Sequence, residues 1–168
     1  MEPDEAPLRL EAYFIENISM ETNPQFDPMV DEYEGHISVE PEILVRKTDD
    51  GVRQLVLRVR YVPKPDGEGG LPYSIDVTGR DFFSFPDPDL PEEQRFQMLI
   101  FNGASILFGL LRAEVAHITA LGAAGSMLLP TVNLTQCLAD WVQAQGDQAN
   151  CSAAPKRQKD TGPTQAEA

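Results

Sequence analysis

Residues 104–121, ASILFGLLRAEVAHITAL, constrain the fold of this chain more than any other stretch. These eighteen residues include one Arg, one Glu and one His. Their large apolar residues recur at close to 3.6 positions, which predicts an α-helix, and Ala and Gly fill much of the remaining surface. A helix that is apolar nearly all round must be buried on more than one face. One sheet in so short a chain covers only one face, so we expect a second copy of the chain to cover another.

A membrane-spanning helix is the alternative interpretation of this stretch. Arg112 and Glu114 lie near its middle, and insertion into a bilayer costs about 2.5 to 3.5 kcal/mol for each central charged residue. The few Leu and Ile residues do not offset that cost. We therefore predict a helix at a protein interface, with no direct membrane insertion.

The charge of the chain limits its partners. The formal net charge is −14, and residues 1–102 carry 22 acidic and 9 basic side chains. Such a surface repels phosphate backbones, so nucleic acid is not expected as a partner. A basic partner would be attracted, although the acidity is also explained by solubility alone.

Length, termini and cysteines predict one cytoplasmic domain with tails. The 168 residues are 42% hydrophobic, enough for one core. The start, MEPDEAPLRLE, lacks the apolar segment of a signal peptide, and Cys137 and Cys151 form no metal or redox motif. We expect a disordered segment at 1–7, a folded domain at 8–145 and a disordered tail at 146–168.

Four segments have the alternating pattern of β-strands: 8–21, 36–46, 54–62 and 72–85. Short turn-forming segments separate most of them, which predicts an antiparallel meander or Greek key. Glu16 interrupts the apolar row of the first strand and predicts a bulge or a sheet edge. Pro41 lacks an amide proton and favours an edge position or a break in the second.

Helices follow the strands. Asp89 and Glu92 have capping-box spacing for a helix from about Pro91 to Phe101. Asn102–Gly103 is expected to interrupt it before the long helix, which ends near Gly122. An extended connection at 126–134 leads to a short helix at 136–145, capped by Thr135.

The sequence offers no constellation for catalysis. It has no Gly-rich phosphate loop, no H-E-x-x-H, no G-x-S-x-G and no CxxC. His36 and His117 are the only imidazoles, and His117 is expected to be a packed or interface residue. We therefore expect neither an enzyme nor a cofactor or metal.

Several motifs together resemble SecB, the bacterial export chaperone. SILF (105–108), Arg112, Gly122 and LLPTVNL (128–134) follow the family pattern without a gap. ENISMET (16–22), LVLRVRY (55–61) and FFSF (82–85) resemble family strands. The resemblance covers about residues 8–145. It implies an α+β fold, with a four-stranded antiparallel Greek-key sheet, helices on one face, and assembly as a dimer of dimers.

The same resemblance implies an ATP-independent holdase that binds unfolded polypeptides. It assigns a client-binding groove to Tyr33, Ile37, Val39, Leu138 and Trp141. It assigns a surface that docks the SecA motor ATPase to Glu21 and Asp76. With the helix pattern, it assigns oligomer contacts to five residues: Ile75, Val77, Ile106, Leu110 and His117.

The resemblance leaves the client open. Preproteins for delivery to SecA are the first expectation, but Asn17 replaces an Asp of the docking patch, and Pro41 replaces an apolar strand residue. The family also includes chaperones that protect the antitoxin of a toxin–antitoxin pair. From another class, a small-ligand-binding protein with residues 22–35 as a lid remains an alternative.

Overall fold

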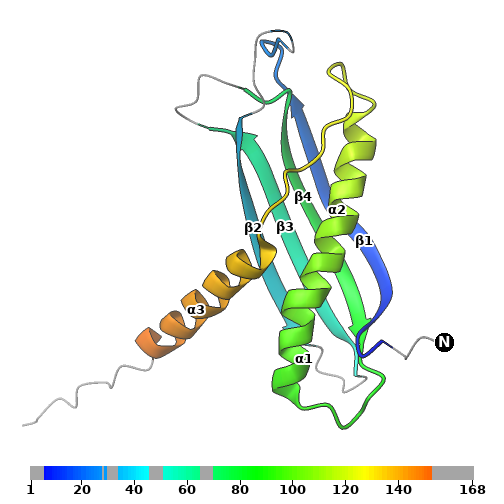
Figure 1. The fold of residues 1–168 in the computed structure, drawn as a ribbon, viewed down its shortest axis with the longest axis vertical. Coiled ribbons are helices and arrows are strands. Elements are labelled where there is room, and N and C mark those ends of the chain that lie inside the picture. Colours follow the sequence, from blue (N-terminus) through cyan, green and yellow to red (C-terminus); the bar gives the residue numbers. More distant parts are fainter. Residues whose placement is uncertain (1–5, 28, 30–33, 46–50, 65–69, 153–168) are drawn as a thin grey trace, which may run out of the picture.

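The sheet is a four-stranded antiparallel Greek key. The computed structural model describes residues 6–27, 29, 34–45, 51–64 and 70–152. Its strands are β1 (Arg9–Thr22), β2 (Gly35–Val45), β3 (Arg53–Pro63) and β4 (Tyr73–Ser84). They lie in the order β1-β4-β3-β2 (Figure 1). The consecutive strands β2, β3 and β4 are therefore neighbours, and β1 pairs with β4 and not with β2. This confirms the Greek-key alternative.

The two faces of the sheet differ because side chains alternate along each strand. In β4 the odd-numbered residues from Tyr73 to Phe83 are buried, and the even-numbered residues are half-buried. The neighbouring β3 has the same alternation in register, with Val59 opposite Val77. One face therefore carries the core and lies under the helices, and the other face is open.

The two edge strands confirm the predictions from Glu16 and Pro41. The register of β1 against β4 shifts between Ile15 and Asn17, which places a bulge at Glu16, and shifts again between Leu10 and Ala12. Strand β2 lies at the other edge and continues through Pro41 without a break. Only an edge position accepts the missing amide donor of proline without losing a ladder hydrogen bond.

The predicted interruption at Asn102–Gly103 is wrong. Helix α1 (Glu92–Met98) continues through a π-helical turn η1 (Leu99–Gly103) into α2 (Ala104–Thr119). The π turn absorbs an extra residue without ending the helix. A Cβ on Gly103 would lie 3.1 Å from the ring of Phe83, so this glycine serves close packing and not helix termination.

The predicted caps are also wrong. Pro91 precedes α1 and no side chain caps it, while the Asp89 amide bonds to Asp87 Oδ1 at 2.9 Å. Helix α3 (Leu134–Ser152) is capped by Asn133, whose Oδ1 accepts from the amide of Gln136 at 3.2 Å, and not by Thr135. Helix α3 also continues past the predicted end at residue 145.

Helix α2 covers the sheet with one face. Its buried residues are Ala104, Leu107, Phe108, Leu111, Val115 and Thr119. The connection after α2 is held by Thr119 Oγ1, which accepts from the amide of Met127 at 2.8 Å, and by the Tyr73 hydroxyl, which accepts from the amide of Ala124 at 2.8 Å. It runs back across the same face to α3, which points away from the sheet (Figure 1). The predicted fold class, α+β with helices on one face, is confirmed.

Among the described residues, the stretch Glu92–Thr119 has the length and hydropathy of a membrane span. The core helix of a soluble protein can have the same length and hydropathy. Here the face of α2 that meets the sheet is buried, as in such a core helix.

Candidate functional site

A row of half-buried apolar residues follows the edge strand β2. Ile37, Val39 and Ile43 point to the helix-covered side and pack on the core without being fully enclosed. Their partners on β3 are Tyr61, Val59 and Leu55, all buried. The core is therefore complete at β3 and only partly covered at β2.

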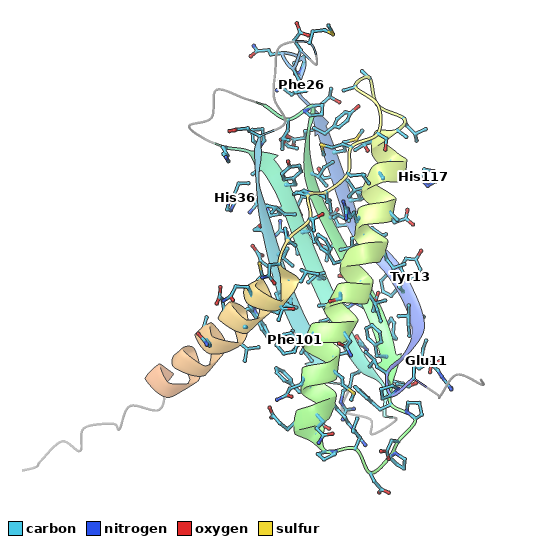
Figure 2. All side chains as sticks on the ribbon, viewed as in Figure 1. Glu11, Tyr13, Phe26, His36, Phe101 and His117 are labelled. Atoms are coloured by element: carbon cyan, nitrogen blue, oxygen red, sulfur yellow. The ribbon has the colours of Figure 1, made fainter. Side chains whose placement is uncertain are left out.

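Two helical segments flank this row. Helix α3 contacts both β2 and η1. Figure 2 shows Phe101 on the side of its helix toward α3. The half-buried apolar side chains on these two segments and on the adjoining α1 are Phe96, Phe101, Leu134, Trp141 and Val142. We call Ile37, Val39, Ile43, Phe96, Phe101 and Trp141 the β2 strip. It is an apolar surface that one subunit leaves partly uncovered.

The predicted groove residues fall unequally on this surface. Ile37, Val39 and Trp141 belong to the β2 strip, and Tyr33 lies outside the described residues. Leu138 is buried in the core at 1% exposure, so it supports the strip from below and offers no contact surface in this conformation. The sequence missed Phe96 and Phe101, because a helical apolar residue by itself is read as core.

A small hollow lies at one end of the β2 strip. It has a volume of about 30 Å³ and is lined by Ile43, Arg53, Glu92, Arg95, Phe96 and Leu99. Two of these residues are arginines, in a chain with an excess of acidic side chains. The strip therefore ends in a polar site.

The predicted oligomer residues lie in two different environments. Ile106 is 39% exposed, Leu110 is half-exposed and His117 is exposed on the outer side of α2 (Figure 2). A cavity of about 220 Å³ at the His117 end of α2 is lined by Ile15, Ile18, Glu114, His117, Ile118 and Leu121. Ile75 and Val77 are instead buried in the core, so they offer no surface to a second copy of the chain.

The predicted docking residues lie on the open face of the sheet. Glu21 is exposed at the end of β1. Asp76 accepts from Arg58 Nε at 2.9 Å and lies 3.7 Å from Arg60 Nε. The hydrogen bond from Arg58 lowers the pKa of Asp76, with a further contribution from the charge of Arg60. Asp76 is therefore a neutralised charge and not a free acidic contact.

Asp81 is an ionisable group that the sequence did not single out. It points to the covered face of β4 at 0% exposure, and neither carboxyl oxygen has a hydrogen-bond partner among the described residues. Burial raises the pKa of Asp81 to about 7. Asp81 occupies an odd-numbered position of β4, and the alternation of the strand could have predicted from the sequence that this position is buried.

No group of three or more His, Cys, Asp or Glu side chains that could hold a metal occurs in the described part of the chain. Cys137 is exposed at the start of α3. The β2 strip and the outer side of α2 are therefore the candidate binding surfaces.

Comparisons with known proteins support the fold. No family model matches the chain, and no curated protein matches it in sequence. Among solved structures, it is similar to the Mycobacterium tuberculosis Rv1957 SecB-like chaperone in complex with a ChAD peptide from the Rv1956 HigA1 antitoxin. That match has a TM-score of 0.61 and 12% identity over 76% of this chain and 91% of the other. A Streptococcus agalactiae protein of unknown function matches with a TM-score of 0.40, 12% identity, and 74% and 97% coverage. This chain therefore has a SecB-like fold.

Proposed function

We propose that this protein is an ATP-independent chaperone that holds unfolded segments of polypeptide on the β2 strip. The observation that carries the proposal is the row of half-buried Ile37, Val39 and Trp141 on a SecB-like fold. Ile37 and Val39 lie on the edge strand β2, where an extended chain can place alternate side chains against them, and Trp141 lies beside them on α3.

The chemistry of holding follows from burial. Each apolar side chain that a client buries contributes roughly 1.5 to 3 kcal/mol. Folded proteins keep such side chains inside, so the strip selects unfolded chains without reading a sequence. Such contacts require neither ATP nor a cofactor, and we assign the protein no enzymatic activity.

We further propose a homotetramer, built as a dimer of dimers, in the cytoplasm. The exposed stripe of Ile106 and Leu110 on α2 is the surface that a second copy would cover. Several strips on one assembly let a single unfolded chain bind at more than one place, which raises avidity by about 10² to 10⁴.

Two kinds of client fit this role, and the structure gives a reason to prefer one. The SecB-like chaperone of similar fold is in complex with an antitoxin peptide, and we propose a dedicated polypeptide client of that kind. Delivery of preproteins to SecA is the second candidate. It is favoured by the exposed Glu21, but Arg58 and Arg60 already neutralise Asp76 on the same face.

The experiment is capture of an unfolded client by a double variant. Phe101→Ala with Trp141→Ala should weaken suppression of client aggregation about tenfold or more, because two large apolar contacts of the β2 strip are lost. The oligomer should retain its native mass. Phe14→Ala is the matched control, since Phe14 is 45% exposed on the open face. Undiminished capture by the double variant would contradict the assignment of the strip.

A further inference from the structure

The hollow at the end of the β2 strip is built from two arginines that share one carboxylate. Arg53 Nη2 donates to Glu92 Oε1 at 3.3 Å and to Glu92 Oε2 at 3.2 Å. Arg95 Nη1 lies 3.9 Å from the same Oε2. Two positive charges therefore face one negative charge.

The arginines are buried and the carboxylate is not. The side chains of Arg53 and Arg95 are 11% and 17% exposed, whereas that of Glu92 is 64% exposed. Arg95 is fixed by donation to the carbonyl oxygen of Pro88 at 2.6 Å and by its position 5.8 Å from the centre of the Phe85 ring. Glu92 is thus the solvent-exposed partner of two largely buried cations.

Both arginines also have unused donors. The Nε atoms of Arg53 and Arg95 are buried without a hydrogen-bond partner among the described residues. A buried charged donor without an acceptor is costly, because it has lost its hydration. The hollow of about 30 Å³ that both side chains line has room for one or two water-sized groups, such as the two oxygens of a carboxylate.

The hollow is in line with the β2 strip. Arg53 begins β3 opposite Val45, which is two residues beyond Ile43 along β2. An extended chain on the strip points alternate side chains toward it, at about 3.3 Å per residue. The side chain two positions past its last apolar contact therefore reaches the arginines.

We propose that Arg53 and Arg95 form a binding site for a carboxylate of the held polypeptide. This inference rests on the proposed function and adds a chemical preference to it. The carboxylate displaces the exposed Glu92 and accepts from the guanidinium groups, which recognise carboxylates through their planar set of donors. An acidic residue then anchors one end of an otherwise apolar segment and fixes its direction on the strip.

The test uses the full-length protein and two labelled peptides, each with the same extended apolar segment and an amidated C-terminus. One has Glu and the other Gln two positions past the last apolar residue. Fluorescence anisotropy measures both dissociation constants. We expect the Glu peptide to bind about tenfold more tightly, as for other hydrogen bonds to charged groups.

Four variants test the site. Arg95→Gln should remove the preference, so that the dissociation constants of the Glu and Gln peptides become equal. Glu92→Gln should enlarge the preference, because it removes the internal competitor. Arg60→Gln, which removes an equal charge from the open face, should leave the preference intact. Arg53→Gln should act like Arg95→Gln, and Arg95→Gln alone is sufficient if the buried Arg53 is needed for folding.

The outcomes separate this inference from the proposed function. If the native protein binds both peptides equally, or if Arg95→Gln keeps the preference, the carboxylate site is wrong and the holding function stands. If neither peptide binds, the proposed function fails, and the site fails with it. A third peptide, which ends at the tested position with a free C-terminal carboxylate, distinguishes chain ends from side chains as the source of the recognised group.

Discussion

Two aspartates of β4 show how differently the two faces of one sheet treat the same side chain. Asp76 lies on the open face beside Arg58, and its pKa is lowered. Asp81 lies on the covered face without a hydrogen-bond partner among the described residues, and burial raises its pKa to about 7. The strand alternates, so a difference of five positions changes the face. The surroundings, a hydrogen bond from Arg58 at Asp76 and burial at Asp81, and not the residue type, decide the direction of the pKa shift.

The comparison extends to the whole molecule. The open face holds ion pairs, such as Arg58 with Asp76 and Arg80 with Glu16. The covered face is apolar apart from the buried Asp81 and Arg53, and the apolar surfaces left uncovered on this side of the molecule are the β2 strip and the outer side of α2. A surface that is apolar but uncovered is where a partner gains most from binding. Because of this contrast, we expect partners to bind on the helical side of the molecule.

The largest expected effect comes from charging the outer side of α2. Ile106→Glu with Leu110→Glu should dissociate the proposed oligomer, because two apolar contacts worth roughly 1.5 to 3 kcal/mol each are replaced by repelling charges. Native mass spectrometry should show smaller species, and the circular dichroism of the subunit should stay unchanged. Arg58→Glu on the open face is the control. An oligomer that survives both charges would place its interface elsewhere.

A smaller effect is expected at Asp81. Its folded pKa of about 7 lies above the ordinary Asp value of 3.8, so the folded state holds its proton more tightly than the unfolded state. The free energy of unfolding therefore falls as pH rises from about 4 to about 7, by up to about 4 kcal/mol at 1.36 kcal/mol for each pKa unit. Asp81→Asn should remove this fall.

Urea unfolding of the native protein and of Asp81→Asn at pH 4 and pH 8 checks this. The two proteins should differ little at pH 4, and the variant should be the more stable at pH 8. Equal stability at pH 8 would mean that Asp81 has a partner or hydration in solution, and the contrast between the two faces would weaken.

The smallest effect is expected at Asp76. Its lowered pKa stabilises the folded state above the ordinary Asp pKa, and this stabilisation is lost as pH falls through the folded pKa. Because the pair with Arg58 is exposed to solvent, Asp76→Asn should reduce the free energy of unfolding at pH 7 by at most about 1 kcal/mol. Urea unfolding of the native protein and of Asp76→Asn at pH 7 measures this reduction. A loss as large as the change at Asp81 would contradict the proposed difference between the faces.

Much of the fold could be predicted because its signals are local. Each predicted strand agrees with the structure to within one or two residues at each end, and Glu16 and Pro41 indicated the bulge and the edge strand. Helix α1 also begins within one residue of the predicted Pro91, but the helix caps could not be predicted in this way. Asp89 and Thr135 are suitable caps by type, but the backbone around them directs other groups to the helix ends.

The candidate site was predictable only in part. Ile37, Val39 and Trp141 were assigned through the resemblance, whereas Phe96, Phe101, Arg53 and Arg95 were not singled out. Arg53 comes from β3, Arg95 and Phe96 from α1, and Phe101 from η1, and they come together only after β2, β3 and the α1–η1 helix pack against one another. An arginine in sequence is presumed to be solvated, and nothing local shows that a ring and a strand will enclose it.

The sequence by itself determined the alternating strands, the apolar helix and the charge of the chain, because periodicity and composition depend only on the order of residues. The tertiary structure decided which edges stay uncovered, which aspartate has its pKa raised, and which two arginines share one carboxylate. Those properties depend on distances between residues far apart in the chain. Burial and electrostatic interaction change over a few ångströms, and only packing sets those distances.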